Sequence, residues 1–307
     1  MVKQRLCEIE PMVAEKLSFW ANPSLLECYA RRDNLTVYYI LVFHNGNLLG
    51  VMPIFEKRKY GFRYVVSPHE YCYTPIDFFL SPELSLFRMQ NHRVEIMKAI
   101  ASFLYKEYVK VMLHLHFDIE DIRAFKWTGY TAIPIYTYIK KLEGYTSDSL
   151  PKDTRRQLNS VAKGNGLYVK ECWDMEAYTK LVKELLLSLR RSLRQVSEKY
   201  IDFLNKLYEL GFCTKHVVYR EDEPMGCAVV MTDSLRAYAF ALVSGISASG
   251  RRLSANHLLF DHQFKSLENM DYFDFYGAGV EDIAYFKSQF NCELVPFYRI
   301  IKKFRVF

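Results

Sequence analysis

Two mostly apolar segments, 37–43 and 48–55, are separated by a short polar turn. Short apolar segments bounded by turn residues are typical of buried strands, and the Asn45-Gly46 pair between them favours a tight antiparallel hairpin. A second pattern of strand, polar turn and strand covers 213–219 and 225–231. The sequence therefore predicts one antiparallel hairpin in each half of the chain.

After each hairpin, apolar residues recur every three or four positions, over 84–108 and over 253–269, which predicts an amphipathic helix at each place. A strand pattern follows each helix, over 109–117 and over 272–276. Further elements are expected as a strand over 167–172, helices over 175–210 with a break near 195–197, a strand over 238–243, and helical structure over 11–32. Strands that alternate with helices, together with hairpins, predict a mixed α/β sheet.

The chain also repeats itself. Residues 119–126 match 280–287 at an offset of 161, with Glu, Asp, Ile, Phe and Lys identical. After one inserted residue, 134–136 and 139–142 match 296–298 and 301–304 at an offset of 162. A repeat of this length predicts a duplicated domain. Residues 144–152 are rich in Ser, Asp and Pro, so we expect two domains, 1–146 and 147–307.

Composition narrows the class of protein. Half of the 307 residues are apolar and a quarter are charged, which excludes a disordered or collagen-like chain. The seven cysteines are scattered without a CxxC motif, which favours reduced thiols. No apolar run approaches the roughly 20 residues of a membrane span, and charged residues within 1–17 are unlike a signal peptide, so we expect a cytoplasmic protein. The net charge of +6 favours anionic partners, but no motif indicates DNA binding.

The order of elements resembles the GNAT superfamily of N-acetyltransferases, and two copies in one chain resemble the FemABX aminoacyltransferases and their GNAT-like relatives. The most specific segments are 151–158, which lies in the expected linker, and 273–279, 283–290 and 293–298. The resemblance implies an α/β (α+β) fold of two tandem GNAT-like domains, each a mixed, largely antiparallel sheet flanked by helices. It also implies that the second domain is the active one.

The first function that the resemblance implies is a bacterial N-acyltransferase that moves an acyl group from acyl-CoA to a small amine, with acyl-CoA as a co-substrate and no tightly bound cofactor. The alternative is a FemABX-like aminoacyltransferase, which would use aminoacyl-tRNA as donor and a cell-wall (peptidoglycan) precursor as acceptor. A third possibility, from another class, is a non-catalytic binding protein that kept the duplicated fold.

The resemblance places the catalytic pair at Phe286-Lys287, since the corresponding Phe-Lys pair of FemABX proteins lies at the substrate cleft, where the lysine stabilises developing negative charge. The first copy has Phe125-Lys126 at the equivalent place, so the pair could instead be a signature of the fold. Asp274 and Tyr276 share one face of the strand pattern over 272–276. Either could line a cleft, Asp274 as a base or by orienting an ammonium, or Asp274 could hydrogen-bond the turn at 277–279.

A donor-binding loop is expected at 245–255, where GNAT enzymes carry a Gln/Arg-x-x-Gly-x-Gly/Ala loop and this chain has a different sequence. A helix that begins there would offer backbone N–H groups and a positive dipole end to a phosphate. The candidate donor or phosphate-binding residues are Ser247, Ser249, Gly250, Arg251 and Arg252. The alternative is an ordinary turn into a helix with two surface arginines.

The loop after the first hairpin supplies the candidate acceptor-binding residues, which are His69, Glu70, Tyr71 and Tyr73, although a solvated turn would have the same composition. The alternation of His114, His116 and Asp118 would place metal-ligand residue types on one strand face, but we expect them to line the first cleft or the surface and predict no metal site. Two basic groups are more typical of solvated helix faces than of phosphate sites: Lys152, Arg155, Arg156 and Lys163, and Arg190, Arg191 and Arg194.

Overall fold

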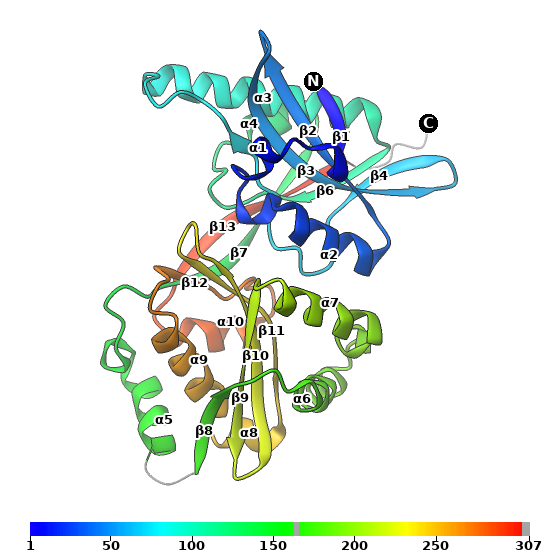
Figure 1. The fold of residues 1–307 in the computed structure, drawn as a ribbon. Helices are drawn as coiled ribbons and strands as arrows, with labels where there is room; N and C mark the ends of the chain where they lie inside the picture. Colours follow the sequence, from blue (N-terminus) through cyan, green and yellow to red (C-terminus); the bar gives the residue numbers. More distant parts are fainter. Residues whose placement is uncertain (163–165, 303–307) are drawn as a thin grey trace. The chain divides into compact units, whose positions relative to one another are not determined.

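The computed structural model describes residues 1–162 and 166–302, so Lys163 lies outside the described residues (Figure 1). The chain forms two compact units. The first unit contains residues 1–135 and the segment that begins at Pro296, and the second contains 136–295. The strands that end the two sequence copies therefore each contribute to both units.

In the first unit, the strand order is β1, β2, β3, β4, β6 and the C-terminal part of β13, with β5 paired to β3. The strands are β1 (Val2–Arg5), β2 (Thr36–His44), β3 (Asn47–Lys59), β4 (Phe62–Val66), β5 (Asp77–Phe78), β6 (Lys110–His114) and β13 (Glu293–Lys302). The pairings are antiparallel except for β4 with β6, which is parallel. The helices are η1 (Leu6–Glu8), α1 (Pro11–Ala14), η2 (Phe19–Ala21), α2 (Pro23–Asp33), α3 (Leu86–Glu107) and α4 (Arg123–Trp127).

In the second unit, the C-terminal part of β7 pairs with β12, and β11, β10, β9 and β8 follow in that order. The strands are β7 (Thr131–Lys141), β8 (Leu167–Glu171), β9 (Cys213–Arg220), β10 (Glu223–Asp233), β11 (Tyr238–Ile246) and β12 (Tyr272–Asp274). The helices are η3 (Ser147–Ser149), α5 (Lys152–Ala162), α6 (Met175–Ser188), η4 (Leu193–Val196), α7 (Glu198–Glu209), α8 (Ala248–Arg252), α9 (Ala255–Ser266) and α10 (Glu281–Ser288). Helices α6 and α7 cover one face of this sheet and α9 the other (Figure 1).

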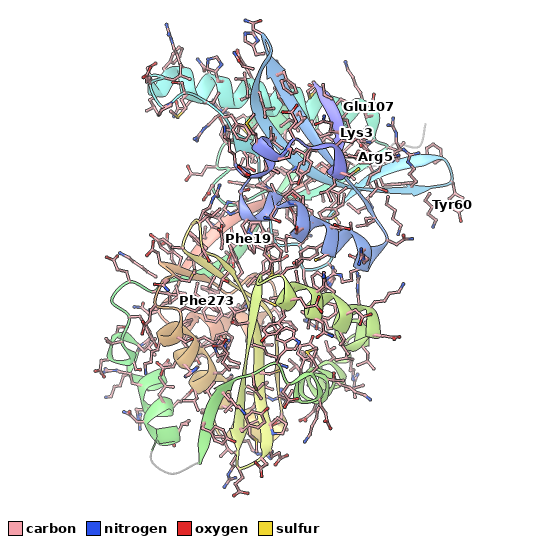
Figure 2. The ribbon with its side chains drawn as sticks, viewed as in Figure 1. Lys3, Arg5, Phe19, Tyr60, Glu107 and Phe273 are labelled. Carbon is pink, nitrogen blue, oxygen red and sulfur yellow. The ribbon has the colours of Figure 1, made fainter. Side chains whose placement is uncertain are left out.

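The periodicity seen in the sequence determines how the helices pack. Helix α3 begins at the N-cap Ser85, whose hydroxyl accepts a hydrogen bond from the N–H of Arg88, and it buries Ile96, Ile100 and Leu104 against the first sheet. Each such buried aliphatic side chain stabilises the fold by about 1.5–3 kcal/mol. In the second unit, phenylalanines of α9, of β12 and the residue after it, and of α10 and the turn after it pack in the core; they are Phe260, Phe264, Phe273, Phe275, Phe286 and Phe290. Figure 2 shows Phe273 inside this unit.

The structure confirms the mixed, largely antiparallel sheets, both hairpins and the helix predicted after each hairpin, α3 and α9. The expected break near 195–197 is η4, between α6 and α7. The interpretation of 151–158 as a linker is wrong, because these residues begin α5, whose Thr154, Leu158 and Val161 repeat at helical spacing and are buried. The domain boundary predicted from the sequence lies at 146/147, whereas the compact units divide within β7 and β13.

Candidate functional site

The two neighbouring parallel strands of the second unit separate partway along their length. Strands β11 and β12 pair over three positions, the last being Phe240 with Asp274, and β11 then continues to Ile246 alongside β10 only. At the point of separation, a register shift leaves Leu242 without an opposite residue on β10. Such a bulge bends a strand and increases its twist, and bulges are frequent next to active sites.

The chain that follows β12 stays with β7. The N–H of Phe275 donates to the carbonyl oxygen of Tyr138 at 2.9 Å, and the N–H of Ala278 donates to that of Tyr136 at 2.8 Å. Because β11 and this loop follow different neighbours, the strand edges that face each other after Phe240 no longer form a ladder. Backbone N–H groups along such an edge are available as hydrogen-bond donors.

The loop at 275–277 has an uncommon conformation. Tyr276 and Gly277 both lie in the left-handed region, with φ of 46° and 80°. For a bulky residue such as tyrosine this conformation costs free energy and is found where surrounding contacts impose it.

Asp274 and Thr137 are two of the residues that impose this conformation. Asp274 is fully buried, and its Oδ1 accepts hydrogen bonds from the Thr137 hydroxyl and, at 2.7 Å, from the N–H of Tyr276. The N–H of Gly277 donates to Thr137 Oγ1 at 3.0 Å. The carboxylate is therefore part of a buried network that orients the loop, and it is linked to Gly277, in the turn at 277–279, through the hydroxyl of Thr137.

Lys287 holds the same loop from α10. Its Nζ donates to the carbonyl oxygens of Phe275, Tyr276 and Gly277 at 2.8, 2.9 and 2.6 Å. An ammonium has three N–H donors, so it can serve all three carbonyl oxygens at once. Lys287 therefore lies at the same loop as Asp274 and Tyr276 and holds its backbone.

Phe286 lies in the phenylalanine core and contacts the ring of His257, with ring centroids 5.1 Å apart. His257 Nε2 lies 2.9 Å from Gln289 Oε1, and burial lowers the pKa of this histidine. These contacts anchor α10, and with it Lys287, to α9.

The predicted donor loop forms the short helix α8, whose first turn is already occupied. Ser247 caps it by accepting a hydrogen bond from the N–H of Gly250 at 2.9 Å. The N–H of Ala248 donates to the carboxylate of Glu184, on α6, at 2.7 Å. Ser249 Oγ lies 3.1 Å from Ser247 Oγ. A carboxylate at this position occupies the place, and supplies the charge, that a phosphate would bring.

The remaining donor candidates lie on both sides of this turn. Arg251 and Arg252 are exposed in the last turn of α8. Gly250 is buried, and a β-carbon there would lie 2.2 Å from the carbonyl oxygen of Met225. Close backbone packing therefore accounts for this glycine.

The candidate acceptor residues lie in the first unit and are mostly buried. Tyr71 and Tyr73 are 1% and 0% exposed, and the Tyr71 hydroxyl donates to the carbonyl oxygen of Trp20. Glu70 accepts a hydrogen bond from buried Arg32 at 3.3 Å. Of the four candidates, His69 is exposed.

His114, His116 and Asp118 have separate environments. Arg299 Nε donates to His114 Nε2 at 3.1 Å, and burial, together with Arg299, lowers the pKa of His114 to about 4. His116 Nδ1 lies 3.2 Å from an Asp118 carboxylate oxygen. Within residues 1–162 and 166–302, no three His, Cys, Asp or Glu side chains are grouped so that they could hold a metal ion.

The basic residues at the start of α5 line a hollow of about 340 Å³, formed by Ser147, Asp148, Lys152, Arg155, Arg156, Leu158 and Asn159. Arg156 forms an exposed ion pair with Asp153 at 3.8 Å. Arg190, Arg191 and Arg194 are exposed, in and beside the break between α6 and α7.

Sequence reasoning missed Thr137 and Glu184. Thr137 is contributed by β7, far from Asp274 in the sequence, and Glu184 reaches α8 from another helix. No local pattern marks either residue, although the repeat pairs Thr137 with position 299 at the offset of 162.

No family model matches the sequence, and no curated protein is similar enough to match it. Solved structures do match. A structure described as FemX has a TM-score of 0.67 and 13% identity over 97% of each chain. The chain has the FemABX/GNAT-like fold.

Two further structures support this fold. The C-terminal domain of a putative lysylphosphatidylglycerol synthetase from Agrobacterium fabrum has a TM-score of 0.59 and 11% identity, over 91% of this chain and 86% of that one. L-PGS from Bacillus licheniformis has a TM-score of 0.56 and 12% identity, over 100% and 95%. The fold that the resemblance implies is therefore confirmed. No helix among the described residues has both the length and the apolar character needed to cross a bilayer.

Proposed function

We propose that the chain is an aminoacyl- or acyltransferase whose active site lies in the second unit, where β11 and β12 separate. The observation that carries this proposal is the combination of the bulge at Leu242 with the held loop at 275–277. The bulge and the loop leave one edge of β11 without a paired strand, next to a backbone segment that Asp274, Thr137 and Lys287 hold in position.

The chemistry requires little more than positioned donors and an unprotonated amine. The amine nitrogen attacks the acyl carbonyl carbon, a C–N bond forms, and the carbonyl oxygen becomes an oxyanion that backbone N–H groups of β11 can stabilise. The bond from the carbonyl carbon to the leaving oxygen or sulfur then breaks. The leaving group takes up the proton that the nitrogen loses.

The side chains have distinct parts in this scheme. Asp274 and Lys287 position the loop, because their bonds go to Thr137 and to the loop backbone. Tyr276 is half-buried on that loop, and we assign its phenol to contact with the substrate.

We favour an aminoacyl ester, as in aminoacyl-tRNA, over acyl-CoA as the donor. Glu184 already accepts the N–H of Ala248 at the start of α8, so a pyrophosphate there would face a carboxylate. Two neighbours with TM-scores above 0.5 are named as lysylphosphatidylglycerol synthetase and FemX, which supports the same choice. By analogy with the FemABX pattern, the acceptor is an amine on a cell-wall precursor.

A transfer assay with labelled donors tests this proposal. Purified protein is incubated with bulk tRNA charged with radiolabelled amino acids, or with radiolabelled acetyl-CoA, and with UDP-linked muropeptide or a mixture of small amines as acceptor. We expect an amide product from charged tRNA. Product from acetyl-CoA alone would reverse the donor assignment, and no product from either donor would favour a non-catalytic binding protein.

A further inference from the structure

The hairpin between β3 and β4 ends in an exposed aromatic residue with an unusual backbone. Tyr60 is 86% exposed, and Figure 2 shows it at the far end of the hairpin. Tyr60 and Gly61 have φ of 52° and 77°, and the neighbouring hairpin between β2 and β3 uses Asn45 and Gly46 with φ of 49° and 81°. Asparagine tolerates this left-handed position, whereas tyrosine is strained there.

The side chains of this hairpin are sorted between its two faces. Directly opposite residues of an antiparallel pair share a face, and the register pairs Lys57 with Tyr64 and Lys59 with Phe62. One face of the hairpin thus alternates lysines with aromatic rings. We call Lys57, Lys59, Tyr60, Phe62 and Tyr64 the lysine–aromatic face.

The opposite face of the hairpin carries Arg58 and Arg63. Arg58 pairs with Glu56 at 2.8 Å and Arg63 pairs with Glu107 at 2.7 Å. Among the described residues, no carboxylate forms an ion pair with Lys57 or Lys59. The positive charge left for an outside partner therefore lies on the lysine–aromatic face.

We propose that the lysine–aromatic face docks reversibly on an anionic lipid surface. Tyrosine rings, which are apolar with a polar tip, lie at the headgroup level of a bilayer, phenylalanine rings are buried at the boundary between headgroups and acyl chains, and lysines beside them are attracted to anionic lipids. The exposed Tyr60 at the tip and the half-exposed Phe62 next to the turn supply the rings, and Lys57 and Lys59 supply the charge. This proposal is independent of the transferase activity.

A single-stranded RNA is the competing partner for an aromatic and basic surface. The Lys59 ammonium lies 5.0 Å from the centre of the Tyr60 ring, over a face on which a base would stack. The arginines, which bind phosphate in a bidentate manner, are paired with Glu56 and Glu107. Both observations favour the lipid surface.

Co-sedimentation with vesicles tests the proposal. The full chain is mixed at low salt with vesicles of phosphatidylcholine and phosphatidylglycerol, or of phosphatidylcholine alone. We expect binding to the mixed vesicles, weaker binding to phosphatidylcholine, and release by salt. Lys57→Gln with Lys59→Gln should weaken binding about 25-fold, at about fivefold per lysine.

The variant Tyr60→Asn tests whether vesicle binding can be lost without a loss of stability. The variant gives this turn the chemistry of the Asn45 turn, so its melting temperature should equal or exceed that of the wild type while vesicle binding falls. Phe87→Asn is the matched control, because Phe87 is 73% exposed on α3 of the same unit, away from the hairpin, and its loss should leave binding unchanged.

Three results would overturn the proposal. The first is equal binding of the wild type to both vesicle types. The second is unchanged vesicle binding by both hairpin variants. The third is binding of a single-stranded oligoribonucleotide that the hairpin variants lose while vesicle binding persists, which would assign the face to RNA.

Discussion

The two halves of the chain repeat the same elements but end their parallel strand pairs differently. In the first half, β4 and β6 pair in parallel, and the chain after β4 returns so that Thr74 bridges to Leu115. The N–H of Thr74 donates to the carbonyl oxygen of His114, and the N–H of His116 donates to that of Thr74 at 3.1 Å. In the second half, β11 leads directly into α8, and its pairing with β12 ends at Phe240.

This difference indicates which half of the duplicated fold has backbone groups left to bind a substrate. Thr74 and its neighbours satisfy the backbone beyond β6 in the first half, so those groups cannot bind a substrate. The corresponding edge in the second half has no such returning segment between β11 and α8. In a duplicated fold, one half can therefore have its backbone groups paired for stability, while the other keeps backbone N–H donors for an oxyanion.

Residues at equivalent positions of the two halves also differ, and the polar network that holds the loop lies in the second half. The repeat makes Ile139 and Ile301 equivalent, and the residues opposite them on the neighbouring strands are Asp274 and Met112. The first half thus has methionine where the second has the buried carboxylate. The two lysines of the repeated Phe-Lys pair also differ, because Lys126 is exposed and Lys287 holds the loop.

The largest expected effect comes from these two lysines. Lys287→Ala should lower the rate of transfer at least about 100-fold, because three carbonyl oxygens lose their donor and the loop beside the reacting carbonyl is displaced. Lys126→Ala should stay within about twofold of the wild type. Initial rates and melting temperatures of both variants check this, and equal losses in the two variants would contradict the division between halves.

Substitution of a strand glycine should cost more unfolding free energy in the second half than in the first. A β-carbon at Gly245 would lie 2.7 Å from the backbone nitrogen of Val182, whereas one at Gly50 would meet the Cγ2 atom of Ile96 at 2.7 Å. A side-chain methyl group can move aside and a helix backbone cannot. We expect Gly245→Ala to cost about 3 kcal/mol of unfolding free energy and Gly50→Ala about 1 kcal/mol, measured by urea denaturation. A larger loss for Gly50→Ala than for Gly245→Ala would contradict this, because it would show that the backbone of α6 moves aside more easily than the side chain of Ile96.

Because His114 is buried, the free energy of unfolding should depend on pH. Burial beside Arg299 lowers the pKa of His114 to about 4, so the unfolded chain binds this proton first as the pH falls. The stability that neutral His114 contributes is complete above about pH 6.5 and is lost towards pH 4. We expect a loss of about 2 kcal/mol between about pH 7 and pH 5.

His114→Gln tests the source of this loss. The variant keeps a hydrogen-bond acceptor for Arg299 but does not titrate, so urea denaturation across this range should show a flatter dependence for His114→Gln than for the wild type. An unchanged slope would assign the titration to other groups.

The smallest expected effect concerns the hydroxyl of Thr137. Thr137→Val keeps the shape of the side chain and removes the bonds to Asp274 and to the N–H of Gly277. We expect transfer to fall about tenfold with a loss of about 1–2 kcal/mol in stability. Thr137→Ser should restore both, and a valine variant with full activity would remove Thr137 from the loop network.

The sequence predicted the parts of the molecule that local patterns encode. Hydrophobic periodicity was sufficient for the hairpins and for α3, and the repeat was sufficient for the duplicated fold. Asp274 and Lys287 could be singled out because they lie in two neighbouring segments of the resemblance, 273–279 and 283–290. Thr137, Glu184 and the burial of Tyr73 depend on tertiary contacts between distant segments, which no local pattern specifies.

Hydrogen–deuterium exchange with a bound donor analogue tests whether the active site lies in the second unit. The probe is an adenosine whose ribose carries alanine through a stable amide, which mimics the end of an aminoacyl-tRNA and cannot react. We expect the analogue to slow exchange at residues 241–246 and 275–279 and to leave exchange at 67–76 and 115–118 unchanged. Protection confined to the segments of the first half would contradict the assignment of the active site to the second.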